Sequence, residues 1–154
     1  MANLQQLYQD VILDHNKNPR NFKEVPTPTH KAHGVNPLCG DDYWITLEVK
    51  DNAISAIGFT GSGCAISKSS GSLMTSMVKD KTVQEALALK DHFLTMITTD
   101  CTDECRQKVG RLKALEGVKQ FPVRVKCATL VWRALEAALE KGILEISTES
   151  QPQL

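Results

Sequence analysis

The apolar residues of segment 43–50 recur at every second position, and this period constrains the fold more than any other feature of the chain. The alternating apolar side chains are Tyr43, Ile45, Leu47 and Val49. Successive side chains of an extended chain point to opposite faces, so the pattern predicts a half-buried β-strand. Asp51 and Asn52 tolerate the left-handed backbone of a tight turn. They predict a second strand over 53–60, with a bulge near Ala56-Ile57.

A single strand pair is only marginally stable, so other elements must cover this hairpin. The loop before Cys39 is a candidate third strand. Elsewhere apolar residues recur at steps of three and four, which predicts helices. The signals for their ends are Pro19, Cys64, a Thr82–Glu85 capping box, Gly117 and Pro122. The expected fold class is therefore α+β, a small antiparallel sheet of about three strands with helices packed on one face.

The length of 154 residues fits one domain, expected over 1–146, with a disordered tail over 147–154. Lysine and arginine number 18 and so do aspartate and glutamate, which argues against a nucleic-acid surface. No apolar run is long enough to span a membrane, and the first residues lack the pattern of a signal peptide. We expect a cytoplasmic protein without nucleic-acid or membrane partners.

The five cysteines are odd in number and unevenly spaced, so a disulfide framework is not expected. Cys39 and Asp41 are two residues apart, and in extended backbone their side chains share one side. Cys64 lies at a predicted helix start, where unpaired N–H groups favour a thiolate. Cys127 follows Arg124 and Lys126, whose charges act in the same direction.

Three cysteines and one carboxylate are a plausible tetrahedral ligand set for zinc, although thiolates bind iron as well. The residues of this set are Cys39, Asp41, Cys64 and Cys127. The alternative is three half-buried cysteines that act as small apolar side chains. Cys101 and Cys105 would share a helix face and form a redox pair or a second zinc site, but incidental residues of a polar insertion are the simpler interpretation.

Four segments together resemble the U-type iron–sulfur cluster assembly family, which contains the IscU and SufU branches. They are "LYQDVILDHNKNPRN", "NPLCGDDYW", "FTGSGCAISKSSGS" and "FPVRVKCATLVWRALE". The resemblance runs from about residue 4 to 142. It implies a SufE/NifU-like fold, with Cys39, Asp41, Cys64 and Cys127 at the positions of the family's metal or cluster ligands. Lys126 stands where the IscU branch has a histidine ligand, and it favours the SufU branch because a protonated lysine has no lone pair for a metal.

For the SufU branch the resemblance implies a zinc-dependent sulfurtransferase, an accessory protein to a cysteine desulfurase. It would accept persulfide sulfur from a desulfurase of SufS type and pass it towards a SufBCD-type assembly complex. Cys39 lies on a loop between Pro37 and Gly40, so we expect this ligand to leave the metal and take the sulfur. The resemblance implies that a histidine of the desulfurase replaces it at the metal. The alternatives are an iron–sulfur scaffold and a zinc-stabilised interaction module. Arg124 is the expected partner of Asp41 outside the ligand set, and Lys126 is expected to add charge beside the site.

Overall fold

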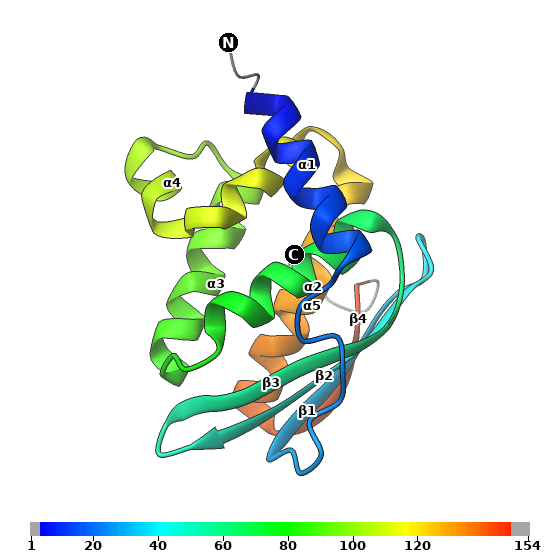
Figure 1. Ribbon diagram of the computed structural model, residues 1–154, viewed down its shortest axis with the longest axis vertical. Helices are drawn as coiled ribbons and strands as arrows, with labels where there is room; N and C mark the ends of the chain where they lie inside the picture. The colour runs from blue at the N-terminus through cyan, green and yellow to red at the C-terminus, as the bar shows by residue number, and fades with distance from the viewer. Residues whose placement is uncertain (1–3, 149–154) are drawn as a thin grey trace.

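Three antiparallel strands make up most of the sheet in the computed structural model, which describes residues 4–148 (Figure 1). They are β1 (His30–Asn36), β2 (Asp41–Lys50) and β3 (Ala53–Ser62). The sheet order is β3-β2-β1-β4, where the short β4 (Ile143–Ser147) pairs with β1 in parallel. The three-stranded antiparallel sheet is confirmed, and the segment before Cys39 does supply its third strand. The added edge strand β4 was not expected from the sequence.

The β2–β3 hairpin turns at Asp51 and Asn52, whose φ angles of 54° and 64° are both positive. This backbone matches the right-handed twist of the flanking strands, and short polar residues tolerate it. The register between the strands shifts once, between Glu48 and Val49. Ser55 is the additional residue on β3, and its hydroxyl donates to the Glu48 carboxylate at 2.6 Å. The predicted bulge therefore lies next to its expected position.

The helices pack against one face of the sheet, as expected (Figure 1). They are α1 (Leu4–Lys17), α2 (Ala65–Val78), α3 (Val83–Thr98), α4 (Asp103–Val109), the 3₁₀ segment η1 (Gly110–Gln120) and α5 (Pro122–Lys141). Thr82 and Glu85 form the predicted capping box of α3. Gly117 does not end a helix, because η1 continues through it to Gln120. No helix within residues 4–148 is long and apolar enough to cross a bilayer.

Close packing between α2 and the sheet depends on a glycine. A Cβ atom at Gly71 would lie 2.7 Å from a ring carbon of Phe59 on β3. The small residues of α2 thus let this helix approach the sheet, as their abundance suggested. Farther along, α5 crosses behind β1 and β2, and its Trp132 stacks on Phe93 of α3 at a centroid distance of 5.0 Å. These contacts make one continuous core around α2 and α5.

Two expectations at the margins of the fold need correction. Cys101 and Cys105 are joined in a disulfide across the start of α4, so they are neither incidental residues nor a second zinc site. Ser147 and Thr148, expected to begin the tail, belong to the folded part. Ser147 pairs with Val35, and the backbone N–H of Thr148 donates to the Val35 carbonyl at 2.9 Å. The rest of the expected tail, residues 149–154, lies outside the described residues.

Candidate metal centre

The hairpin between β1 and β2 positions Cys39 and Asp41. Asn36 and Asp41 face each other as the last pair of the two strands, which leaves a four-residue loop over 37–40. The backbone N–H groups of Cys39 and Gly40 both donate to the Asn36 carbonyl, at 3.2 and 2.9 Å. Gly40 has a φ of +75°, a conformation that glycine adopts without steric cost. This tight reversal carries Cys39 at its partly exposed tip and Asp41 in the buried first position of β2.

Cys64 is the N-cap residue of α2, as its predicted position at a helix start indicated. Its sulfur accepts a hydrogen bond from the Ser67 backbone N–H at 3.4 Å. The backbone N–H of Cys64 in turn donates to Asp41 Oδ1 at 2.9 Å. The start of α2 is therefore attached to the start of β2 through the carboxylate. This leaves the Cys64 sulfur beside the same carboxylate.

Cys127 comes from the second turn of α5 and is 2% exposed. The side chains of Cys64, Cys39 and Asp41 lie near its thiol and raise its pKa. The amide of Asn36 also donates to the Cys127 sulfur, at 3.6 Å. Ligand atoms of Cys39, Asp41 and Cys127 all lie within 4.8 Å of one another. The structure thus brings three of the four predicted ligands into one group, Cys39, Asp41 and Cys127. Cys64 is not part of that group, but it lies next to it through its contacts with Asp41 and Cys127.

Asp41 is a buried carboxylate that is hydrogen bonded but lacks a cationic partner. Its Oδ1 accepts from Cys64 N–H and from the Ser67 hydroxyl, at 2.9 and 3.0 Å, and its Oδ2 accepts from Asn36 Nδ2 at 3.1 Å. No lysine, arginine or histidine of residues 4–148 forms an ion pair with it. A buried charge is costly unless it is paired or coordinates a metal. With three cysteine sulfurs beside it, this donor set fits a zinc ion, and thiolates accept iron as well.

The thiols of Cys64 and Cys127 are strongly coupled. The hydrogen bond from Cys127 is the main reason that the pKa of Cys64 falls to about 6, with Ser67 adding to the effect against the cost of burial. The same hydrogen bond, together with burial, raises the pKa of Cys127 far above that of an ordinary thiol. The proton shared by the two sulfurs therefore favours the thiolate form of Cys64. A metal cation would take the place of that shared proton.

The residues expected around the ligand set are placed differently. The Arg124 guanidinium lies over the Phe121 ring, 4.6 Å from its centroid, and not beside Asp41. Asn36 and Ser67 hold Asp41 instead, and sequence reasoning missed both. The only available signal was that each lies three residues from a predicted ligand. Lys126 is half-buried in the turn before Cys127.

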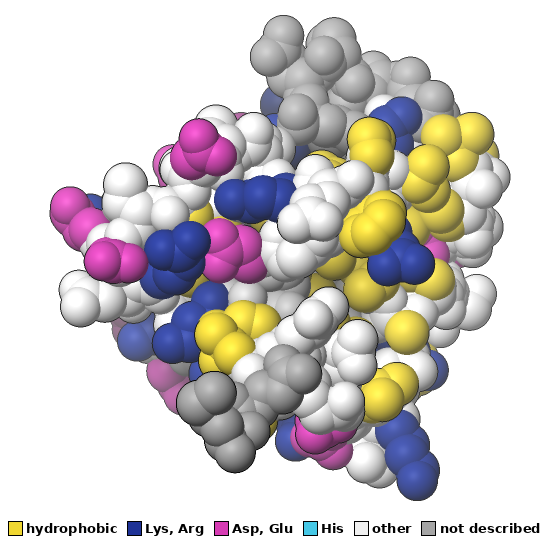
Figure 2. Space-filling view, turned by 90° about the horizontal axis from the view of Figure 1, so that it is seen from above, with side chains coloured by type: hydrophobic (Ala, Val, Ile, Leu, Met, Phe, Trp, Pro, Cys, Tyr) yellow, Lys and Arg dark blue, Asp and Glu magenta, His cyan; other side chains and the backbone are white. Residues whose placement is uncertain are grey.

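An apolar groove runs beside the metal centre, with a volume of about 720 Å³. One wall is α1, from Leu4 to Leu13, and the other is the end of η1, from Ala114 to Gln120. Ile66, Phe121 and Arg124 complete the lining, from the first turns of the two helices that carry Cys64 and Cys127. Apolar side chains gather on one side of this end of the molecule (Figure 2). The groove and the metal centre thus share the starts of α2 and α5.

These features define a class of protein, an α+β domain in which Cys39, Asp41 and Cys127 lie close enough together to hold a metal ion, with Cys64 next to them. Residues 7–141 match the family described as the NifU-like N terminal domain. The chain belongs to this family, which includes the IscU and SufU proteins.

Individual relatives cover nearly the whole chain. The zinc-dependent sulfurtransferase SufU of Bacillus subtilis is 41% identical over 91% of this chain and 94% of its own. The iron–sulfur cluster assembly scaffold protein IscU of Streptococcus pyogenes serotype M1 is 36% identical over 92% of this chain and 88% of its own. The crystal structure of FiSufU from Fervidobacterium islandicum superposes with a TM-score of 0.80, at 29% identity, over 90% of this chain and all of that one.

Proposed function

We propose that the protein is a zinc-dependent sulfurtransferase of iron–sulfur cluster assembly, with Cys39, Asp41, Cys64 and Cys127 as the metal ligands. The observation that carries the proposal is the position of Cys39, which joins the buried cluster from the tip of an accessible hairpin. The similarity to a zinc-dependent sulfurtransferase over nearly the whole chain supports the same function. Bound zinc would keep the cysteine ligands in the thiolate form and protect them from oxidation.

Cys39 is the sulfur acceptor in this proposal. Its neighbour Leu38 is 63% exposed, whereas Cys127 is buried and Cys64 caps a helix. The Cys39 thiolate attacks the outer sulfur of a cysteine persulfide on the donor protein. A new S–S bond forms on Cys39 while the donor's S–S bond breaks, and the donor cysteine leaves as a thiolate. Cys39 then carries a persulfide that a second thiol can take over.

The donor is a cysteine desulfurase, and we assign it to the SufS type, with a SufBCD-type complex as the downstream acceptor. A protein partner must contact the surface around the Cys39 hairpin. The apolar groove at the starts of α2 and α5 supports such docking, because it offers a concave apolar surface next to the cysteines. The free thiols of the site require a reducing compartment, so we place the protein in the cytoplasm.

A cluster scaffold is the second candidate, and the similarity to an IscU scaffold favours it. The ligand set itself does not distinguish zinc from iron. Lys126 argues for sulfur transfer, because it offers no lone pair at the position where the IscU branch has a histidine. A scaffold would also have to release an assembled cluster to an acceptor protein. The two candidates therefore differ in what leaves the site, a sulfur atom or a whole cluster.

The test combines metal analysis with a sulfur-transfer assay. We expect the purified protein to hold one zinc and to accelerate sulfide release by a SufS-type desulfurase supplied with cysteine and reductant. Cys39→Ser should reduce the rate to that of the desulfurase alone. Mass spectrometry should find one additional sulfur atom on Cys39 of the wild-type protein when the reductant is left out.

A matched control removes cysteines that lie outside the metal centre. The double variant Cys101→Ser/Cys105→Ser should accelerate the desulfurase as well as the wild type does under reductant. If the protein instead accumulates a coloured cluster that moves to an apo-acceptor, without accelerating the desulfurase, the scaffold function is correct. If Cys39→Ser retains full acceleration, Cys39 is not the sulfur acceptor.

A further inference from the structure

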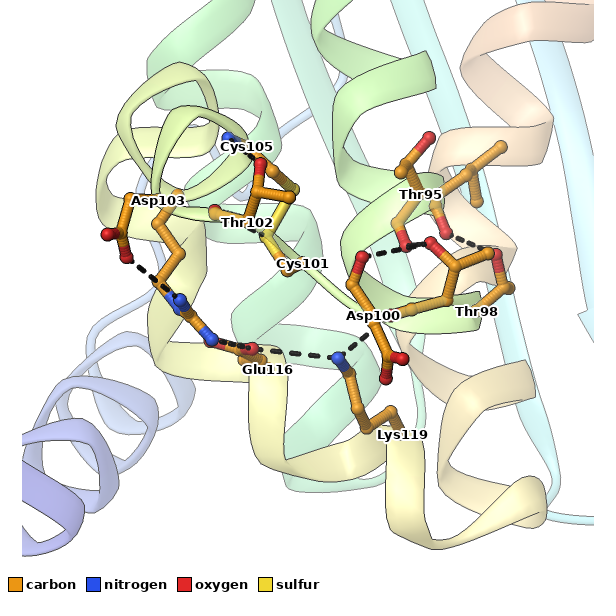
Figure 3. The surroundings of a disulfide bond; sticks show 12 residues. Thr95, Thr98, Asp100, Cys101, Thr102, Asp103, Cys105, Glu116 and Lys119 are labelled. Atoms are coloured by element: carbon orange, nitrogen blue, oxygen red, sulfur yellow. Dashed lines mark hydrogen bonds and ion pairs between the residues drawn. A yellow bond between two sulfur atoms is a disulfide. The ribbon is translucent and has the colours of Figure 1, made fainter.

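Cys101 and Cys105 lie on either side of the residue that begins α4, and their disulfide closes this turn (Figure 3). The Thr102 hydroxyl caps the helix by accepting the Cys105 backbone N–H at 3.2 Å. The two Cα atoms are 5.5 Å apart, within the usual range for a disulfide. Cys101 is buried and Cys105 is half-buried. Neither belongs to the metal cluster, so the sulfur-transfer function leaves this pair without a role.

Two sets of polar contacts connect the disulfide to the η1 wall of the groove. Arg106, which follows Cys105, donates from Nε and Nη2 to the two carboxylate oxygens of Glu116, both at 3.1 Å. Lys119 donates to the carbonyl of Thr99, two residues before Cys101, at 2.8 Å. Lys119 also lies 3.5 Å from Glu116, so the contacts form one network (Figure 3). Glu116 and Lys119 both line the groove.

The geometry allows the Cys101–Cys105 disulfide to be reduced while the protein stays folded. The Thr102 cap of α4 uses no sulfur atom, and Val109 at the end of α4 is buried in the core. The ring closed by the disulfide spans only residues 101–105. In the chain-entropy model a ring this short shifts a local opening equilibrium by roughly 30-fold, less than a longer ring would. Both redox states are therefore compatible with the folded protein, and they differ in how firmly the turn is held.

We propose that Cys101 and Cys105 are a reversible dithiol–disulfide couple, separate from the metal centre, whose redox state sets how firmly η1 is held as a wall of the groove. In the disulfide state the chain between α3 and α4 is fixed. Arg106 then holds Glu116 in place, and the Thr99 carbonyl holds Lys119. In the dithiol state the segment between α3 and α4 gains freedom, and the η1 wall loosens with it. The redox state of the pair would thus adjust the groove beside the metal centre.

The reaction partner is a low-molecular-weight thiol and its disulfide, such as glutathione. An external thiolate attacks the more accessible sulfur, that of Cys105, forming a mixed disulfide and releasing Cys101 as a thiolate that takes up a proton. A second external thiolate attacks the external sulfur of the mixed disulfide and releases Cys105, which also takes up a proton. One protein disulfide and two thiols thus become one protein dithiol and one external disulfide. Oxidation of the pair is the reverse sequence.

The first test is a redox titration of the zinc-loaded protein in buffers that run from fully reduced to fully oxidised glutathione. Free thiols are trapped by alkylation at each point, and trypsin then releases both cysteines in one peptide, residues 91–106. We expect this peptide to pass from doubly alkylated to disulfide-bonded within the range, while the metal-bound cysteines keep their zinc. A peptide that stays in one state throughout, whether dithiol or disulfide, overturns the proposed couple.

The second test is amide hydrogen exchange of the oxidised and reduced proteins, each loaded with zinc. We expect exchange in residues 110–120 to be several-fold faster, and up to roughly 30-fold faster, after reduction. The variant Cys101→Ser/Cys105→Ser should exchange at the rate of the reduced wild type, and its rate should not change with the redox buffer. Faster exchange that is confined to residues 101–109 would overturn the link to the groove wall. Because sulfur transfer is not measured, the result does not depend on the proposed function.

Discussion

At the scale of single residues, Gly63 shows how tightly the metal centre is packed. A Cβ atom there would lie 2.5 Å from Asp41 Oδ1, 2.6 Å from Ser67 Oγ and 2.7 Å from the hydroxyl of Tyr43. We predict that Gly63→Ala displaces Asp41 and weakens zinc binding by roughly 10–100-fold, the usual effect of disturbing groups that orient ligands. Competition with a chromophoric chelator measures this affinity.

Gly117 is the matched control for Gly63, because a Cβ atom there meets nothing within 4 Å. Gly117→Ala should leave zinc affinity unchanged and leave stability within about 1 kcal/mol of the wild type. Equal zinc affinities for the two variants would show that the close packing at Gly63 is not needed to keep Asp41 in position.

Residue types and local order revealed the four proposed ligands, but not the groups that hold them. The spacing of Cys39 and Asp41 puts both side chains on one side of an extended chain. Cys64 was selected by its predicted helix start and Cys127 by the cations before it, and the family resemblance indicated the same four positions. Asn36 and Ser67 are common polar residues that become important only when their donors face Asp41. Arg124 was chosen because it is close to Cys127 in sequence, but its position in α5 directs it over Phe121.

At the scale of elements, a nearly buried lysine joins α3 to α5. Lys90 Nζ lies 2.6 Å from carboxylate oxygens of both Glu136 and Asp91, and its side chain is 8% exposed. Burial by itself would lower the pKa of Lys90, but the hydrogen bonds to Asp91 and Glu136 outweigh it and raise the pKa. The stabilisation from this raised pKa is fully present below the ordinary pKa of lysine. It is lost as the pH rises through the raised value.

We predict that Glu136→Gln lowers the free energy of unfolding by about 1–3 kcal/mol at neutral pH, because it removes a charged partner from a buried donor. Asp91→Asn should cost less, about 0–1 kcal/mol, since Asp91 is 68% exposed and its ion pair is screened by solvent. Urea unfolding of both variants measures the difference. If the two substitutions lower the free energy of unfolding equally, the Lys90–Glu136 ion pair between α3 and α5 is no stronger than a surface contact.

Strongly periodic elements were predictable, and elements that depend on distant partners were not. The alternation in β2 and the capping box of α3 are local signals, and the structure confirms both. Gly117 has a φ outside the positive range and open space around it, so the chain passes through it without ending η1. Strand β4 forms because β1 offers an unpaired edge beside the end of α5, and no local pattern reports that edge.

At the scale of the whole molecule, the hydrophobic core and the metal centre are separate sources of stability. The core cluster contains large side chains from α2, α3, α5 and the sheet, and it includes none of the four proposed ligands. A fold of this size buries enough apolar surface to stand without a metal. We therefore expect removal of zinc to loosen the hairpin over 37–42 and leave the rest of the fold intact.

Chelation of zinc is predicted to leave the far-ultraviolet circular dichroism spectrum nearly unchanged and to lower Tm. Zinc present at a thousand times its Kd stabilises the folded state by about 4 kcal/mol, which corresponds to roughly 8–16 °C for a domain of this size. Thermal melts with and without chelator measure the shift. Wholesale loss of helical signal on chelation at 25 °C would show that the metal is required for folding.

The sequence by itself determined the α+β class, the β2–β3 hairpin, most helix boundaries and the chemistry of the proposed ligand set. These depend on side-chain period, capping residues and donor types, which act over a few neighbouring positions. Only the tertiary structure decided which donors meet. Packing of α2 and α5 against the sheet carries Cys64 and Cys127 to the β1–β2 hairpin and places Asn36 and Ser67 around Asp41. Those meetings depend on how distant elements pack, and no short stretch of sequence records that packing.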